Sequence, residues 1–199
     1  MEAMSKMKDN AYDICITDPP YNVGYKYNSY EDELDADEYK NWCKNWFLEL
    51  ERVVSGCILI SCGHVNVGMW YDIKKPKWLL CWHKPAAMGR SSVGFCNFEP
   101  VLFYGKTGKQ SVDVFKAPII PDDRMDFHSC PKPVRWAEMQ LHNYAKEGWK
   151  VLDIFGGSFT TAIACHNLGY SLDLWELDED YYKAGVKRFN QHKQQLRIF

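Results

Sequence analysis

The chain has 199 residues, of which 46% are hydrophobic and 25% charged, and its formal net charge is −2. This composition predicts a globular domain and excludes a disordered chain, while the near-neutral charge argues against a protein that coats nucleic acid by bulk charge. No stretch approaches the ~20 uncharged apolar residues of a membrane span, and no apolar signal segment opens the chain, so we expect a cytoplasmic protein.

The eight cysteines show no metal-binding pattern. None has the two-residue gap to another cysteine that zinc knuckles use, and most lie inside apolar runs. We therefore expect free, mostly buried thiols in a reducing compartment, and no metal site.

The predicted elements begin with a buried strand over residues 12–17, which ends at the loop 18–21, Asp-Pro-Pro-Tyr. A helix is predicted over residues 35–54, where Trp42 and Trp46 recur at helical spacing and are expected in the core.

Further along the chain, strands are predicted over 56–61, 78–82, 99–104, 149–154 and 171–175, and helices over 133–144, 160–168 and 180–195. Residues 90–95 and 105–126 carry no such pattern and are expected to be irregular. The alternation of strands and helices predicts an α/β fold with a mostly parallel sheet and helices on both faces.

The loop at residues 18–21 is the first candidate site. Because it follows a strand, it lies at the carboxyl edge of the sheet, where open α/β sheets bind their ligands. The two prolines stiffen the loop and leave its carbonyls free to accept hydrogen bonds. Asp18, the Pro19 carbonyl and the ring of Tyr21 together suit a planar ring that bears an exocyclic amine. An ordinary surface turn is the alternative explanation for the same residues.

A second motif spans residues 151–161, where a strand ends in Gly156-Gly157 and a helix begins. Glycines let the backbone approach a ligand, and the N–H groups at a helix start attract an anion. The next strand ends at Glu176, where an acid suits the two hydroxyls of a ribose. These features predict a nucleoside cofactor without choosing between NAD and S-adenosylmethionine. The three-glycine dinucleotide fingerprint is absent, which weakly disfavours a dehydrogenase.

Together the two motifs resemble those of the DNA amino-methyltransferases, which methylate the exocyclic amine of adenine or cytosine with S-adenosylmethionine. The likeness covers nearly the whole chain. Residues 82–85 and 97–103 look like the family's middle strands, and His-Ser-Cys-Pro-Lys-Pro at 128–133 is similar to its His-Pro-Thr-Gln-Lys-Pro element. The order, with the catalytic motif first, is similar to that of the permuted beta class. The resemblance implies a Rossmann-like, S-adenosylmethionine-dependent methyltransferase fold.

The resemblance also implies roles for single residues. An Asp at position 18 favours adenine, because cytosine enzymes usually carry Ser there. A base flipped out of double-stranded DNA is expected to stack on Tyr21 and to bind Asp18 and the Pro19 carbonyl through its amine. The implied catalytic residues are Asp18, Pro19, Pro20 and Tyr21, and the implied cofactor-binding residues are Lys132, Asp153, Phe155, Gly156, Gly157, Ser158, Thr160 and Glu176.

A basic segment over residues 74–109 holds seven lysines and arginines and one acid. Such a segment is either a phosphate-contacting face or a solvated face without a partner. The candidate DNA contacts within it are Lys84, Arg90, Lys106 and Lys109.

We expect a single methyltransferase domain over residues 1–199, with a catalytic half at about 10–104, a recognition loop at about 105–127 and a cofactor-binding half at about 128–199. The loop is too short for a separate recognition domain. We therefore expect a short or relaxed recognition site, with a homodimer or a partner subunit as ways to extend it.

Two departures from the family keep other functions open. Phe159 stands where the cofactor loop usually has its last glycine; it is strained if that position needs a positive φ, and otherwise its ring narrows the cofactor pocket. Only about a dozen residues precede the strand at 12–17, so we expect the family's preceding strand to be missing or truncated. The alternatives are a cytosine-N4 enzyme, an RNA or protein-glutamine methyltransferase, and a degenerate non-catalytic nucleic-acid-binding subunit. We expect a bacterial or mobile-element origin, with restriction-modification as one setting.

Overall fold

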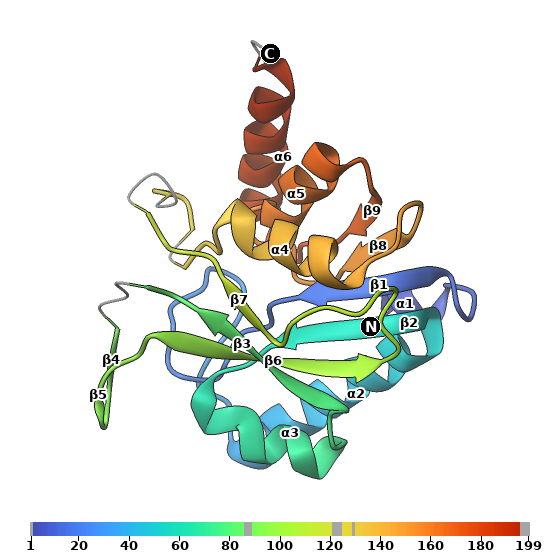
Figure 1. Cartoon of the computed structure of the whole chain (residues 1–199). Helices are drawn as coiled ribbons and strands as arrows, with labels where there is room; N and C mark the ends of the chain where they lie inside the picture. The colour runs from blue at the N-terminus through green and yellow to red at the C-terminus, as the bar shows by residue number, and fades with distance from the viewer. Residues whose placement is uncertain (1, 86–88, 121–124, 129, 196–199) are drawn as a thin grey trace.

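The computed structural model describes residues 2–85, 89–120, 125–128 and 130–195. Seven strands form its main sheet: β1 (Tyr12–Thr17), β2 (Val54–Ser61), β3 (Trp78–His83), β6 (Phe98–Gly105), β7 (Val114–Lys116), β8 (Lys150–Asp153) and β9 (Ser171–Leu174). They lie in the order β7-β3-β6-β2-β1-β8-β9 (Figure 1). The central strands are buried because their side chains are apolar on both faces; Ile14, Cys15 and Ile16 are fully buried.

Of these seven strands, only β6 runs opposite to its neighbours. It pairs antiparallel with β2 and β3, whereas β1 pairs parallel with both β2 and β8, and β8 pairs parallel with β9. The carboxyl ends of β1 and β8 therefore meet at one edge of the sheet. The prediction of a mostly parallel sheet is confirmed.

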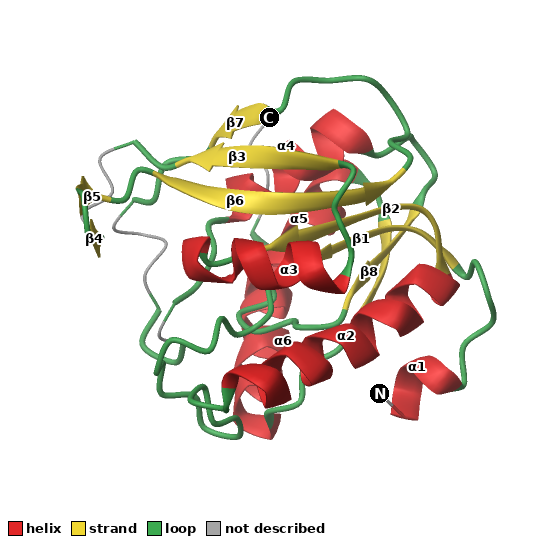
Figure 2. Ribbon diagram, turned by 90° about the horizontal axis from the view of Figure 1, so that it is seen from below, coloured by secondary structure: helices red, strands yellow, loops and turns green. Residues whose placement is uncertain are grey.

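Helices cover both faces of the sheet, as predicted (Figure 2). Helices α2 (Ala36–Val53) and α3 (Val67–Ile73) pack on one face, with the short α1 (Glu2–Ser5) beside α2. Helices α4 (Val134–Tyr144) and α5 (Thr160–Leu168) pack on the other face, and α6 (Glu179–Gln194) lies outside α5. No helix in the described part of the chain is long and apolar enough to cross a membrane.

Helix α2 forms where its residues provide a cap and an apolar stripe. The Asp35 carboxylate accepts a hydrogen bond from the Asp37 amide at 2.9 Å, which satisfies one of the free donors at the helix start. Trp46, Leu50 and Val53 recur three or four residues apart and are buried against the sheet. The helix ends where the chain turns directly into β2.

Two stretches expected to be irregular contain strands. Residues 90–95 form a hairpin of β4 (Arg90–Ser91) and β5 (Gly94–Phe95), and residues 114–116 form β7, which lies parallel to β3. Strands of two or three residues are too short to show an alternating pattern, so the expectation was wrong at both places. All eight cysteines are free, and five of them are buried.

Candidate active site

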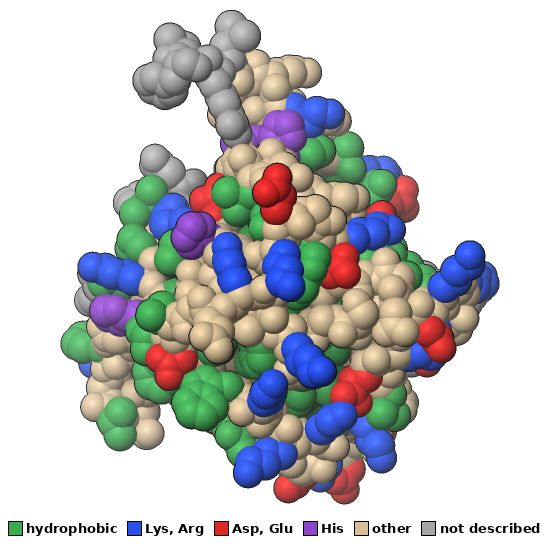
Figure 3. Space-filling view, turned by 45° about the vertical axis from the view of Figure 1, so that its right-hand side comes forward, with side chains coloured by type: hydrophobic (Ala, Val, Ile, Leu, Met, Phe, Trp, Pro, Cys, Tyr) green, Lys and Arg blue, Asp and Glu red, His purple; other side chains and the backbone are tan. Residues whose placement is uncertain are grey.

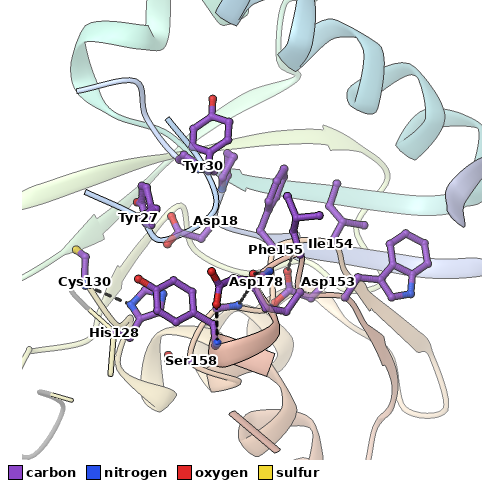
Figure 4. A pocket seen from close by; sticks show the side chains of 18 of the residues that line it. Asp18, Tyr27, Tyr30, His128, Cys130, Asp153, Ile154, Phe155, Ser158 and Asp178 are labelled. Carbon is purple, nitrogen blue, oxygen red and sulfur yellow. Dashed lines mark hydrogen bonds between the residues drawn. The ribbon is translucent and has the colours of Figure 1, made fainter. Parts of the chain in front are cut away.

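A cavity of about 460 Å³ opens at the carboxyl ends of β1 and β8. Figure 4 shows side chains from loops far apart in the sequence meeting there, among them Asp18, Asp153, Ser158 and Asp178. The cavity is lined by all twelve residues that were predicted to be catalytic or cofactor-binding: Asp18, Pro19, Pro20, Tyr21, Lys132, Asp153, Phe155, Gly156, Gly157, Ser158, Thr160 and Glu176. The roles of these residues stay predictions, but the fold brings all of them to one place.

The loop after β1 is held from two sides. The Tyr39 hydroxyl of α2 donates to the Pro20 carbonyl at 2.7 Å, and the Asn66 amide donates to the Tyr21 carbonyl at 2.5 Å. Among the described residues, none donates to the Pro19 carbonyl. This carbonyl is therefore available as an acceptor at the edge of the cavity.

The Asp18 carboxylate carries one donor on each oxygen. Lys132 Nζ lies 2.8 Å from Oδ2, and the Tyr21 hydroxyl lies 2.7 Å from Oδ1. The same hydroxyl lies 2.7 Å from Oε1 of Glu99. Because a hydroxyl has one proton, Tyr21 donates to only one of the two carboxylates at a time.

Glu99 at the start of β6 completes a charged cluster that sequence reasoning missed. Its Oε1 lies 3.1 Å from Lys132 Nζ, and its Oε2 lies 3.0 Å from Lys84 Nζ. Two carboxylates thus face two ammonium groups, and the side chains of Lys84, Glu99 and Lys132 are largely buried. Glu99 lies between 15 and 81 residues from the other members, so no local pattern could have revealed the cluster.

Burial and charge set different proton affinities for the two carboxylates. Burial raises the pKa of Asp18, and the nearby Glu99 raises it further against the opposing effect of Lys132. Burial also acts on Glu99, but the Lys132 and Lys84 ammonium groups outweigh it and lower its pKa to about 2. Asp18 is therefore the more basic of the pair, and Glu99 remains ionised at neutral pH.

The loops after β8 and β9 form the other wall of the cavity. Asp153 is buried at the end of β8, where its Oδ1 accepts from the Thr17 hydroxyl at 2.9 Å and from the Phe155 amide at 3.1 Å. Burial raises the pKa of Asp153 to about 6. Glu176 accepts from the Gly157 amide at 2.6 Å and from the Asp178 amide at 2.8 Å, so this acid ties the two loops together.

Phe159 does occupy a left-handed position, with φ +63°, directly before α5. Its ring does not narrow the cavity, because it packs between Gly185 and Tyr182 of α6 and is only 6% exposed. Phe159 therefore combines a buried ring with a backbone conformation that usually favours glycine.

A tyrosine-rich loop over residues 22–30 lines the cavity and was not predicted to do so. The buried Asp32 carboxylate holds the start of this loop by accepting from the amides of Asn22, Val23 and Tyr25. The Ser29 hydroxyl, near its end, bonds to the Asp178 carboxylate. The loop supplies three rings to the cavity: Tyr25, Tyr27 and Tyr30.

Trp42 and Trp46 were expected to be core residues. Both belong to the packing between α2 and the sheet, but they also line the cavity and contact the Phe155 ring, with centroids 5.6 and 5.4 Å apart. A core helix therefore forms part of the cavity wall.

The four candidate DNA contacts lie in three different settings. Lys84 is largely buried and directed at Glu99, whereas Arg90 is exposed on β4. Lys106 and Lys109 follow the end of β6, where the Lys106 amide bonds to the Gly56 carbonyl at the edge of the sheet opposite the cavity. Figure 3 shows basic side chains gathered on the side of the molecule that carries this opposite edge. DNA contact by Lys106 and Lys109 stays a prediction that their placement does not favour.

Comparison with known proteins identifies what the chain is similar to. The model of a family described as "DNA methylase", with N6 and N4 amino-methyltransferases in its name, matches residues 12–126 and 120–187. The type II methyltransferase M.ScaI of Streptomyces caespitosus is 33% identical over an alignment of 248 residues. This alignment covers 98% of this chain and 81% of that protein.

Solved structures show the same fold at low sequence identity. The complex of M1.HpyAVI with SAM has a TM-score of 0.65 and 21% identity, and covers 94% of this chain and 92% of that one. The cytosine-N4-specific PvuII DNA methyltransferase has a TM-score of 0.73 and 13% identity, and covers 98% of this chain and 84% of that one.

Proposed function

Since the chain belongs to the DNA methylase family of N6 and N4 amino-methyltransferases, we propose that it transfers a methyl group from S-adenosylmethionine to the N6 amine of adenine in double-stranded DNA. The observation that carries this proposal is that Asp18 and Pro19 are adjacent in the loop that lines the cavity, where the Asp18 carboxylate keeps free lone pairs and no described group donates to the Pro19 carbonyl. Two acceptors side by side on a stiff loop suit the two hydrogens of an exocyclic amine.

The residues present fit S-adenosylmethionine. The cavity is of the size that holds a small ligand, and its wall is mainly apolar with a few polar groups. Glu176 uses one lone pair of each oxygen for a backbone amide, and the others remain available to ribose hydroxyls. Phe155 and the loop at 156–158 would hold the rest of the nucleoside. When bound, the cofactor supplies an electrophilic methyl group on a sulfonium centre.

Asp18 and Pro19 orient the amine in this mechanism. Each Asp18 oxygen accepts at most one hydrogen bond and keeps a second lone pair, so an amine can bind without displacing Lys132 or Tyr21. Hydrogen bonding to Asp18 and Pro19 directs the nitrogen lone pair and increases its electron density. An amine nitrogen that accepts the methyl group which bound S-adenosylmethionine would supply must lose a proton. Asp18 accepts it, because it would bind the amine directly and because its pKa is raised whereas that of the neighbouring Glu99 is lowered.

Tyr21 provides the ring on which the flipped base stacks. The ring is supported from below by Gly63, where a Cβ would lie 3.3 Å from Cδ2 of Tyr21. Lys132 and Glu99 act as positioning residues in this proposal, since they hold Asp18 and the Tyr21 hydroxyl. Lys132 also lines the cavity, and its binding of the cofactor stays a prediction. Sequence selection is proposed for the short segment around residues 105–127, of which 121–124 lie outside the described residues.

The choice of adenine over cytosine rests on the aspartate at position 18, by resemblance to the adenine enzymes. A cytosine-N4 enzyme on the same scaffold is the second candidate, since the PvuII enzyme is described as cytosine-N4-specific and has the same fold. Both candidates use the same loop and the same amine chemistry.

Nucleoside mass spectrometry of unmethylated DNA, incubated with the protein and S-adenosylmethionine, tests the proposal. N6-methyladenine is the expected product. N4-methylcytosine as the product would change the target base to cytosine and leave the proposed mechanism unchanged. Absence of any methylated base, together with measurable cofactor binding by calorimetry, would overturn the DNA substrate; absence of both would indicate a degenerate subunit.

A further inference from the structure

We propose that the hairpin of β4 and β5, residues 89–96, enters the groove of the DNA duplex beside the target base. The inference rests on the proposed DNA methyltransferase function and adds the part of the molecule that contacts the duplex.

The hairpin starts from the edge of the sheet that carries the catalytic loop. β3 ends at His83 and β6 begins at Phe98, which are paired in register, and the Lys84 amide bonds to the Asn97 carbonyl at 2.6 Å. Lys84 reaches Glu99 from the same place. The base of the hairpin is therefore joined to the charged cluster around Asp18.

Beyond this base the hairpin stands clear of the rest of the molecule. Figures 1 and 2 show β4 and β5 extending outward from the sheet. A Cβ placed on Gly94 would meet no described atom within 4 Å, and the side chain of Val93 at the turn is 95% exposed. The hairpin nevertheless has its own backbone bonding. The Cys96 amide donates to the Gly89 carbonyl at 2.8 Å, and Arg90 of β4 is the antiparallel register partner of Phe95 of β5.

The exposed side chains of the hairpin suit DNA. The Arg90 guanidinium lies over the Phe95 ring, 4.8 Å from its centroid, so the ring holds the cation on an exposed part of the hairpin. Ser91 and Ser92 add hydroxyls, and the described hairpin contains no acid. Lys116 of β7, paired in register with His83, places a second exposed cation at the same edge. Exposed cations can contact the phosphates of DNA, and an apolar tip can contact its stacked bases.

The size of the hairpin matches a groove of B-form DNA. Two strand residues and half of a two-residue turn reach roughly 10 Å at about 3.3 Å per residue. The major groove is about 12 Å wide and about 8.5 Å deep, and it admits a two-stranded ribbon. A base flipped into the cavity leaves its duplex at the mouth of the cavity, so the hairpin is placed next to the gap in the stack. We assign Arg90 to the DNA backbone or a base edge and Val93 to the apolar contact at the tip.

The test compares Arg90→Gln and Val93→Ser with two matched controls in the full chain. Lys146→Gln removes an exposed cation at the opposite edge of the sheet, and Leu48→Ser removes an exposed apolar side chain from α2. Binding of a duplex is measured by fluorescence anisotropy at several salt concentrations, and methyl transfer is measured in single turnover. S-adenosylmethionine affinity and far-ultraviolet circular dichroism report on folding.

We expect Arg90→Gln to weaken duplex binding about tenfold and to reduce its salt dependence by about one phosphate contact. Val93→Ser should slow methyl transfer to a paired base about tenfold and have less effect when the target base is mismatched, because flipping then costs less. Both variants should bind the cofactor as the wild type does, and both controls should bind and methylate DNA normally.

Duplex binding and transfer equal to wild type in both variants would overturn the hairpin assignment while leaving the proposed function intact. So would a change in the oligomeric state of Val93→Ser without a change in DNA binding, since the tip would then contact a second protein molecule. If the wild-type protein binds duplex but transfers no methyl group, the proposed function is contradicted. The ratio of variant to wild-type duplex affinity then still tests the hairpin. A wild-type protein that binds no duplex overturns both.

Discussion

The ring of Phe159 fills the space beside Gly185: a Cβ placed on Gly185 would lie 2.1 Å from Cδ2 of Phe159. Phe159 has a left-handed backbone at the start of α5, and Gly185 lies in the middle of α6. The two positions therefore depend on each other, since the ring can be buried only where the facing helix has no side chain. Their coupling links the cofactor loop to α6.

Gly185→Ala should destabilise the protein by about 1–3 kcal/mol, because the new methyl group overpacks the Phe159 ring. In a Phe159→Gly background the clash is absent, and the better helix propensity of alanine, worth about 1 kcal/mol, should make the same change neutral or stabilising. Urea denaturation of the four proteins in the cycle measures both effects. Equal destabilisation in the two backgrounds would contradict the coupling.

Asp18→Asn should reduce the single-turnover rate of methyl transfer at least 100-fold, because the amide keeps the shape but cannot accept the proton of the amine. Cofactor affinity, measured by calorimetry, should change little, since Asp18 bonds to Lys132 and Tyr21 rather than to the loops after β8 and β9. Asp72→Asn removes an exposed carboxylate as a control. Transfer near the wild-type rate would exclude Asp18 as the acceptor.

Glu99→Gln should shift the acid limb of the pH–rate profile to lower pH. The negative charge of Glu99 raises the pKa of Asp18, and without it Lys132 interacts with Asp18 alone, so that pKa falls. Activity depends on ionised Asp18 and is lost as the pH falls through its pKa, so a lower pKa extends activity to more acid solution.

Profiles of kcat between pH 4 and 9 measure this shift, with Glu147→Gln, an exposed acid at the opposite edge, as the control. A purely structural role for Glu99 predicts a lower rate with an unmoved limb, which would disprove its action through Asp18.

Asp153→Asn should change how stability depends on pH. Burial raises the pKa of Asp153 from an ordinary 3.8 to about 6 in the folded protein, so folding favours its protonated form. That stabilisation is present below about pH 4 and is lost as the pH rises through about 6, a difference of about 3 kcal/mol for two pKa units. Denaturation at pH 4 and pH 7 should show the loss in the wild type relative to the variant. Parallel behaviour of the two proteins would mean that Asp153 titrates normally.

The sequence predicts the long elements well because each carries its own signal. β1 and α5 begin and end at the predicted residues. The hairpin at 90–95 and the strand at 114–116 were missed. Both are held by pairing with distant or exposed partners rather than by a buried apolar pattern.

Predictions for single side chains also depend on whether the signal is local in the sequence. Residues 18–21 and 153–160 could be predicted to share one site because each motif is contiguous and lies at the end of a strand, so the sheet brings both to its carboxyl edge. Lys84 was interpreted as a DNA contact from its basic neighbours, yet its ammonium group faces Glu99 inside the molecule. Charge counted along a chain does not reveal which partner a long side chain reaches.

By itself, the amino-acid sequence determined the α/β fold class, the family motifs and the position of the cavity, because hydrophobic periodicity and contiguous motifs are local properties. Only the tertiary structure decided the pairing of Lys132 with both Asp18 and Glu99, and the packing of Phe159 against Gly185. These contacts join residues 26 to 114 positions apart, and they exist because sheet order and helix packing bring distant segments within a few ångströms. The charge state of the site follows from that proximity and from burial, neither of which the order of residues expresses.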